Sequence, residues 1–275
     1  MITNNPMQLK AYVKKMAAEK NISAQLVMQN YMMERLLERV SLSKYKENFI
    51  LKGGFLIASI VGLDTRTTMD LDTTIKGFEL THDSIHKIFE DICKIAVKDD
   101  VTFSVNRTTD IRETDDYPGI RVSLIARYPP LKVPMTVDVT TGDKITPHEI
   151  EYTFRLLFDE RSISIMAYNL ETILVEKLET VLSRNIANTR PRDFYDVYIL
   201  YTLRGFECDS MILKSALEET AKKRGSLSVL GRYKSIIDSI SKDSGMQNFW
   251  TNYQKEFDYA KDISFEETCD AEFLS

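Results

Sequence analysis

Two short stretches decide the fold of this chain, KGGFL at residues 52–56 and RTTMDLD at residues 66–72. Gly53 and Gly54 directly precede a predicted helix, and Asp70 and Asp72 lie on a predicted strand. Residues two apart on a strand point to the same face, so both carboxylates can bind the same metal ions. Glycines before a helix let backbone N–H groups and the positive helix end approach a phosphate. A phosphate cradle beside an acidic pair is what phosphoryl or nucleotidyl transfer requires.

The composition is that of an ordinary globular protein. The 275 residues, 43% hydrophobic and 28% charged, suffice for one large domain or two smaller ones. The three cysteines indicate neither a disulfide framework nor a metal pair, and the three histidines lack zinc-site spacing. No stretch approaches the roughly 20 apolar residues that cross a bilayer, and the polar residues 1–6 lack the apolar core of a signal peptide. We therefore expect a cytoplasmic location and no membrane partner.

The hydrophobic pattern predicts an α+β fold with a helical C-terminal part. Helices are predicted over residues 7–43, with a break at 21–23, and over 55–61 and 82–96. Residues 49–51 form a short apolar run that ends at the glycine motif. Strands are predicted at 69–75, 101–106, 120–127 and 133–140, with a turn at 128–130. From Leu170 onward the pattern is helical, with Asn169 as the N-cap. We expect two domains, residues 1–165 with the N-terminal helices and the sheet, and residues 166–275, which are helical.

A third carboxylate, Asp138, is predicted to join the acidic pair. The alternation at residues 135–139 leaves Asp138 on the polar face of a strand, while Val137 and Val139 point into the core. Two Mg²⁺ ions about 3.5–4 Å apart need several carboxylate oxygens, one of which bridges them. An Asp-x-Asp pair alone is also common in exposed turns. The glycines upstream favour the interpretation as a metal site formed by Asp70, Asp72 and Asp138.

The helical part contributes a further set of candidates. Lys177 lies in the middle of a predicted helix among apolar neighbours. A solvated surface lysine is the simplest interpretation. A lysine that reaches the nucleotide would instead neutralise triphosphate charge as a point cation, and Lys177→Ala would then weaken NTP use and leave the free energy of unfolding within about 0.5 kcal/mol. Asp193 and Asp196 lie at the start of the next helix, where the dipole stabilises carboxylates whatever else they do.

The charge balance limits how a nucleic acid could bind. The net charge is −5 and the sequence pI is near 5.4, so the chain as a whole is acidic. A nucleic-acid substrate would have to be held by a local basic patch. Arg184, Arg190 and Arg192 form the concentrated basic region near these motifs, and they could bind phosphates of the RNA or the nucleotide.

Taken together, these motifs resemble the AbiEii/AbiGii nucleotidyltransferase toxins, the toxin halves of type IV toxin–antitoxin and abortive-infection systems. The resemblance rests on motifs that occur in the same order between residues 26 and 203: Lys52-Gly53-Gly54, Arg66 through Asp72, Asp138, Glu176-Lys177-Leu178 and Arg192 through Asp196. It implies a DNA polymerase beta-like nucleotidyltransferase core, a mixed sheet flanked by helices, followed by a helical C-terminal domain.

The resemblance also implies roles for individual residues. Metal and nucleotide would bind at the glycine pair and the Asp-x-Asp motif, a later lysine would contact phosphate, and a further aspartate would be needed for activity. The residues at these positions are Lys52, Gly53, Gly54 and Arg66 for the nucleotide, Asp70 and Asp72 for metal, Lys177 for phosphate and Asp193 for activity. Gly54 stands where serine is common in the family, so a contact there would be made through the backbone N–H.

The predicted function is therefore transfer of a nucleoside monophosphate from an NTP to a hydroxyl at the 3′ end of tRNA, which would block translation. Mg²⁺ or Mn²⁺ is the expected cofactor, NTP and tRNA are the expected substrates, and a cognate antitoxin is the expected partner. Asp193 is expected to orient Lys177 or an arginine. Two alternatives stay open at this point: nucleotidyl transfer to a protein or small-molecule hydroxyl, and a non-catalytic nucleotide-binding module.

Overall fold

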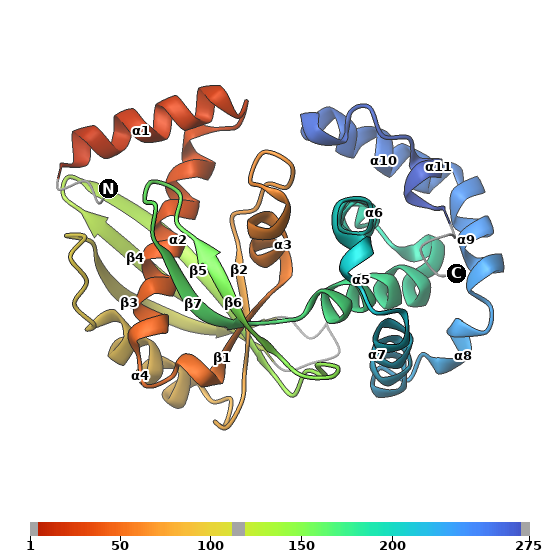
Figure 1. The fold of residues 1–275 in the computed structure, drawn as a ribbon, viewed down its shortest axis with the longest axis horizontal. Coiled ribbons are helices and arrows are strands. Elements are labelled where there is room, and N and C mark those ends of the chain that lie inside the picture. The colour runs from red at the N-terminus through yellow and green to blue at the C-terminus, as the bar shows by residue number, and fades with distance from the viewer. Residues whose placement is uncertain (1–4, 112–118, 271–275) are drawn as a thin grey trace. The chain divides into compact units, whose positions relative to one another are not determined.

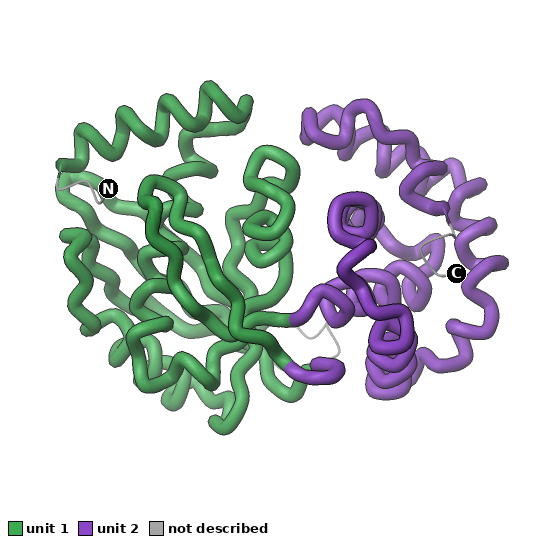
Figure 2. The backbone as a smooth tube through the Cα atoms, in the orientation of Figure 1, with its two compact units in different colours: residues 1–143, 149–168 green, residues 144–148, 169–275 purple. Residues whose placement is uncertain are grey.

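The computed structural model describes residues 5–111 and 119–270, and these form two compact units (Figure 2). Unit 1 comprises residues 1–143 and 149–168, and unit 2 comprises residues 144–148 and 169–275. Residues 1–4 of the polar N-terminus lie outside the described residues. The predicted division into two domains, 1–165 and 166–275, stays a prediction.

Unit 1 is built around one mixed sheet of seven strands within the described residues, in the order β3-β4-β5-β2-β1-β7-β6 (Figure 1). The strands are β1 (Phe49–Lys52), β2 (Leu71–Ile75), β3 (Thr102–Asp110), β4 (Gly119–Tyr128), β5 (Leu131–Thr141), β6 (Ile150–Arg155) and β7 (Ser162–Ala167). Strands β2 and β5 pair in parallel, as do β1 and β7, and the other neighbours are antiparallel. The α+β class with a mixed sheet is confirmed.

Four α-helices of unit 1 accompany this sheet among the described residues: α1 (Pro6–Glu19), α2 (Ala24–Leu42), α3 (Gly53–Val61) and α4 (His82–Cys93). The predicted break between the first two helices is confirmed. Ser23 is the N-cap of α2, and its side chain accepts a hydrogen bond from the backbone N–H of Leu26 at 3.1 Å. Helix α3 begins earlier than predicted, because Gly53 and Gly54 form its first two residues.

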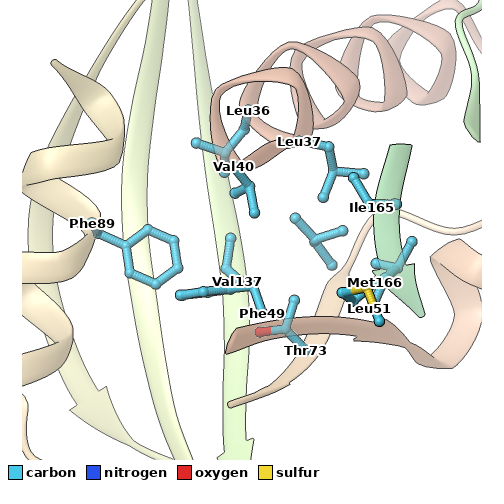
Figure 3. Close-up of a pocket in the computed structure, with 11 residues that line it drawn as sticks. Leu36, Leu37, Val40, Phe49, Leu51, Thr73, Phe89, Val137, Ile165 and Met166 are labelled. Atoms are coloured by element: carbon cyan, nitrogen blue, oxygen red, sulfur yellow. The ribbon is translucent and has the colours of Figure 1, made fainter. Parts of the chain in front are cut away.

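Helices α2 and α4 pack on the same face of the sheet, and their apolar side chains form the core of unit 1. Figure 3 shows Leu36, Leu37 and Val40 of α2 and Phe89 of α4 around a small gap above the strands. The gap has a volume of about 10 Å³ and is lined almost entirely by apolar side chains, so it offers a water too few polar partners. Val137 of β5 also lines this gap. Because successive side chains of a strand point to opposite faces, Asp138 lies on the other face of the sheet.

Unit 2 is helical, as predicted. Its α-helices in the described residues are α5 (Leu170–Arg184), α6 (Pro191–Arg204), α7 (Ser210–Lys223), α8 (Leu227–Leu230), α9 (Tyr233–Lys242), α10 (Ser244–Glu256) and α11 (Phe265–Thr268). Asn169 is the N-cap of α5, and its side chain accepts from the backbone N–H of Thr172 at 2.8 Å. Phe194 and Tyr195 of α6 pack with Trp250 of α10 in an aromatic core that holds the helices together.

Other details also differ from the prediction. The edge strand β6 and its neighbour β7 were not predicted, although their residues alternate between polar and apolar in a way that is typical of strands. Helix α4 ends at Cys93 rather than at residue 96. Strand β2 begins at Leu71, so Asp70 lies just before the strand and not on it.

Candidate functional site

A row of four charged residues crosses the sheet of unit 1 on the face opposite α2 and α4. The pairing register places Arg121 of β4 beside Asp138 of β5, Asp138 beside Asp72 of β2, and Asp72 beside Lys52 of β1. Neighbouring strands lie about 4.8 Å apart, so two carboxylates stand next to each other with a cation at each end. We call these four residues the charged row.

The backbone of Gly53 is shaped to let Asp72 lie against the start of α3. Gly53 has a φ of +68°, a left-handed conformation that L side chains rarely adopt. A Cβ at this position would lie 2.1 Å from the Oδ2 of Asp72 and 2.8 Å from its Cβ. Only glycine therefore lets the Asp72 carboxylate reach the first turn of the helix. This contact joins the two motifs that the sequence predicted to act together.

Gly54 packs closely against different neighbours. A Cβ there would lie 3.0 Å from a guanidinium nitrogen of Arg66 and 3.1 Å from the hydroxyl of Thr68. Arg66 is 1% exposed, and its Nη1 donates a hydrogen bond to the carbonyl oxygen of Thr67. The structure therefore places the predicted nucleotide-binding Arg66 beneath the glycine pair, as a buried cation at the positive end of α3.

Lys52, at the N-cap of α3, forms a buried ion pair with Asp143. The Oδ2 of Asp143 also accepts hydrogen bonds from the hydroxyl of Tyr168 at 2.7 Å and from that of Thr140 at 3.0 Å. Burial alone would raise the pKa of Asp143, but the charge of Lys52 and these hydrogen bonds outweigh it and lower the pKa. Lys52 makes no side-chain capping bond to α3. Its ammonium group pairs with Asp143, which Tyr168 in turn holds through a hydrogen bond, at the edge of the charged row.

Arg121 is the member of the charged row that sequence analysis missed. Its Nε and Nη2 donate to the two oxygens of Asp138, each at 2.7 Å, in a bidentate pair. These hydrogen bonds raise the pKa of Arg121. Burial acts in the opposite direction and lowers it, while the negative charges of Asp138, Asp70 and Asp72 raise it further. The turn at Pro129-Pro130 would have revealed it, because counting back from Tyr128 opposite Leu131 places Arg121 opposite Asp138.

The three predicted metal ligands lie in one neighbourhood but do not form a ready metal site. Within residues 5–111 and 119–270, no group of three or more histidine, cysteine, aspartate or glutamate side chains is arranged to hold a metal ion. Asp138 instead binds the guanidinium of Arg121, on which Asp70 and Asp72 also act. The donor set nevertheless fits a divalent cation, because carboxylates are its preferred ligands and this cluster already attracts a cationic group.

The predicted residues of unit 2 form a separate cluster around Lys177. Its Nζ lies 2.9 Å from Asp193 Oδ1 and 3.1 Å from Asp196 Oδ2, and both carboxylates are buried. The Lys177 side chain is only 16% exposed, so the interpretation as a solvated surface lysine is wrong. Local pattern could not reveal this, because the burial of Lys177 depends on the packing of α5 against α6. Asp193 also lies 3.4 Å from the Nε of Arg190, so it contacts both a lysine and an arginine.

The three arginines of the predicted basic patch differ in exposure. Arg190 and Arg192, at the start of α6, are exposed, and Arg184, at the end of α5, is half-buried. The guanidinium groups of Arg190 and Arg192 are therefore accessible to a phosphate, although Arg190 also lies beside Asp193.

Among the described residues, no helix is both long and apolar enough to cross a membrane.

Comparison with solved structures gives distant similarities. JHP933 from Helicobacter pylori is 15% identical, with a TM-score of 0.46, and the match covers 92% of this chain and 97% of that one. An antigenic nucleotidyltransferase-like protein from Paracoccidioides brasiliensis is 17% identical, with a TM-score of 0.39, and the match covers 70% of this chain and 88% of that one. A search of the curated proteins finds no match.

Comparison with protein families gives a match that spans most of the chain. The model described as "Nucleotidyl transferase AbiEii toxin, Type IV TA system" matches residues 35–271, a range that includes the charged row, the glycine pair and the Lys177 cluster. The chain belongs to the AbiEii nucleotidyltransferase toxin family of type IV toxin–antitoxin systems.

Proposed function

We propose that this protein transfers a nucleoside monophosphate from an NTP to a hydroxyl at the 3′ end of tRNA and thereby blocks translation. One observation carries the chemical part of the proposal. Asp72 and Asp138 are neighbours on parallel strands, and Asp72 lies against the glycine start of α3. Carboxylates that can hold a metal ion thus adjoin backbone N–H groups that can bind a phosphate.

In the proposed reaction, the acceptor oxygen attacks the α-phosphorus of the NTP. A new P–O bond forms, the bond to the β-phosphate oxygen breaks, and pyrophosphate leaves with that electron pair. The proton of the acceptor hydroxyl passes to a carboxylate, for which Asp138 is the candidate. Gly53 and Gly54 would bind the triphosphate through backbone N–H groups. The buried positive charge of Arg66 would increase the positive potential at the N-terminus of α3, which attracts the phosphates.

Mg²⁺ or Mn²⁺ is the proposed cofactor, held by Asp70, Asp72 and Asp138. A bound divalent cation would neutralise charge on the triphosphate and orient the attacking and leaving oxygens. Lys177 is proposed to stabilise the charge of the departing pyrophosphate, and Asp193 to orient Lys177. Because Lys177 and Asp193 belong to unit 2, this part of the proposal is tested separately.

The proposed acceptor follows from exposed positive charge, and the proposed partner from family membership. Exposed Arg190 and Arg192, with Arg184, are the proposed contacts to RNA phosphates. Membership of a toxin family supports a cognate antitoxin as the partner. We place the activity in the cytoplasm, where NTP and tRNA are both available.

The test is incubation of the protein with each of the four α-³²P-labelled NTPs, Mg²⁺, total RNA and a protein extract. Label in the tRNA band, lost after replacement of Asp72 by asparagine, supports the proposal. The matched control is Asp64→Asn, because Asp64 is a carboxylate of the same unit that pairs with Lys20 at 2.7 Å. Label in protein or in a small molecule would show that the enzyme performs nucleotidyl transfer to an acceptor other than tRNA. Binding of NTP without any transfer would instead support a non-catalytic nucleotide-binding module.

A further inference from the structure

Arg121 stands where a metal ion would have to bind, and it uses both oxygens of Asp138. The two bonds from Nε and Nη2 are 2.7 Å each and form a planar fork, the strongest geometry for a guanidinium and a carboxylate. The Asp138 side chain is 18% exposed and that of Arg121 is 47% exposed. The carboxylate is therefore largely shielded from solvent, while about half of the Arg121 side chain remains in contact with it.

The charge around Arg121 explains why it stays there. Asp70, Asp72 and Asp138 all act on its guanidinium, so three negative charges surround one positive charge. Without a cation, adjacent carboxylates on paired strands would repel each other. The guanidinium relieves this repulsion, which is also what a divalent cation would do at the same place.

We propose that Arg121 is a built-in competitor of the divalent cation, which binds Asp138 until metal or metal–nucleotide displaces it. This inference rests on the proposed function, because it assigns the metal to Asp70, Asp72 and Asp138. Displacement turns the Arg121 side chain out of the charged row and frees both Asp138 oxygens together. Arg121 therefore sets the concentration of metal at which the site forms, and it contributes no ligand to the metal.

The experiment measures Mn²⁺ affinity without turnover, by the electron paramagnetic resonance signal of free Mn²⁺ in titrations of the full chain. Arg121→Ala should lower the Mn²⁺ dissociation constant roughly tenfold, the effect of removing one charge-assisted bidentate pair. Arg121→Lys keeps the positive charge but loses the fork, so its dissociation constant should fall between those of wild type and Arg121→Ala.

A matched control separates competition at Asp138 from a general effect of charge. Arg127 lies on the same strand and the same face as Arg121, and its Nη1 donates to the hydroxyl of Ser104 at 2.7 Å. Arg127→Ala removes an equal charge and should leave the Mn²⁺ affinity within about twofold of wild type. Circular dichroism of each variant verifies that the sheet is folded.

Each remaining outcome overturns the proposal in a recognisable way. Unchanged or weaker Mn²⁺ binding by Arg121→Ala, with normal binding by wild type, would reject competition while leaving the metal site in place. Wild-type affinity in Arg121→Lys, or an equal gain in Arg127→Ala, would show that only net charge matters. Failure of every variant to bind Mn²⁺ would reject the proposed metal site, and the role of Arg121 with it.

Discussion

Replacing Gly53 with alanine tests whether the contact between α3 and Asp72 makes the site. The φ of +68° costs an alanine about 1–2 kcal/mol. The new Cβ would also lie 2.8 Å from the Cβ of Asp72, which belongs to strand β2 and cannot rotate away. Overpacking of this kind costs about 1–3 kcal/mol. The free energy of unfolding of unit 1 should therefore fall by roughly 2–5 kcal/mol, the sum of the two terms.

Gly225 offers a matched control for the backbone term. Its φ is +69°, and an added Cβ would meet no heavy atom within 4 Å. Gly225→Ala should therefore cost only about 1–2 kcal/mol. Trp250, the single tryptophan, lies in unit 2 and reports the unfolding of that unit by fluorescence. Far-ultraviolet circular dichroism reports both units, so a transition that it shows and the fluorescence does not belongs to unit 1.

The same variant tests the site as well as the fold. An alanine at position 53 moves the Asp72 carboxylate away from α3, so label transfer from NTP should drop at least a hundredfold at temperatures where the sheet is intact. Gly225→Ala should transfer label at the wild-type rate. A Gly53→Ala protein that is as stable as Gly225→Ala and fully active would refute the reasoning, because Asp72 would then tolerate displacement.

Four further predictions follow from the described contacts. Asp72→Asn should abolish label transfer without unfolding the sheet, and retained turnover would reject the metal assignment. Lys177→Ala should lower the free energy of unfolding of unit 2 by about 3–5 kcal/mol, because it removes the buried cation that Asp193 and Asp196 share; Lys177→Arg, which keeps the charge, should unfold near wild type yet transfer label slowly. Burial raises the pKa of Glu34 to about 7 from an unfolded value of 4.5. The free energy of unfolding should therefore fall by about 3 kcal/mol, relative to that of Glu34→Gln, as the pH rises from 4.5 through 7. If the melting temperatures of the two proteins instead change in parallel with pH, this expectation is wrong. Replacing Arg190 and Arg192 together with alanine should flatten the salt dependence of RNA affinity by roughly 0.7–0.9 per lost phosphate contact, and identical slopes would show that RNA binds elsewhere.

Local pattern was sufficient for most of the fold. The capping residues Ser23 and Asn169 marked helix starts, and the alternation around Asp138 gave both its strand and its face. The nucleotidyltransferase family and the mixed sheet of an α+β fold are confirmed. Both were predictable because the residues that indicate them lie within short stretches of sequence. Strands β6 and β7 were not predicted, although the alternation of polar and apolar residues in both is a local signal that could have revealed them.

The site was harder to predict, because its contacts depend on the register between distant segments. The sequence predicted that Asp72 and Asp138 meet, and the parallel pairing of β2 with β5 places them side by side. It did not predict that Arg121 binds Asp138 or that Lys52 is held by Asp143. The register of the hairpin of β4 and β5 could have revealed Arg121 by counting from its turn. Asp143 lies after the end of β5 and far from Lys52 in the sequence, so no local pattern indicates that pair.

The parallel pairing of β2 with β5 also determines when this protein can first act during its own synthesis. Strand β2 leaves the ribosome well before β5, which contributes Asp138 and ends at Thr141. At about 5–20 residues per second, the second strand follows the first by several seconds, and the charged row cannot form until both have emerged. Lys52, the glycine pair and Asp72 are therefore synthesised and exposed before Asp138 can join them, and the site is completed only after β5 has paired with β2.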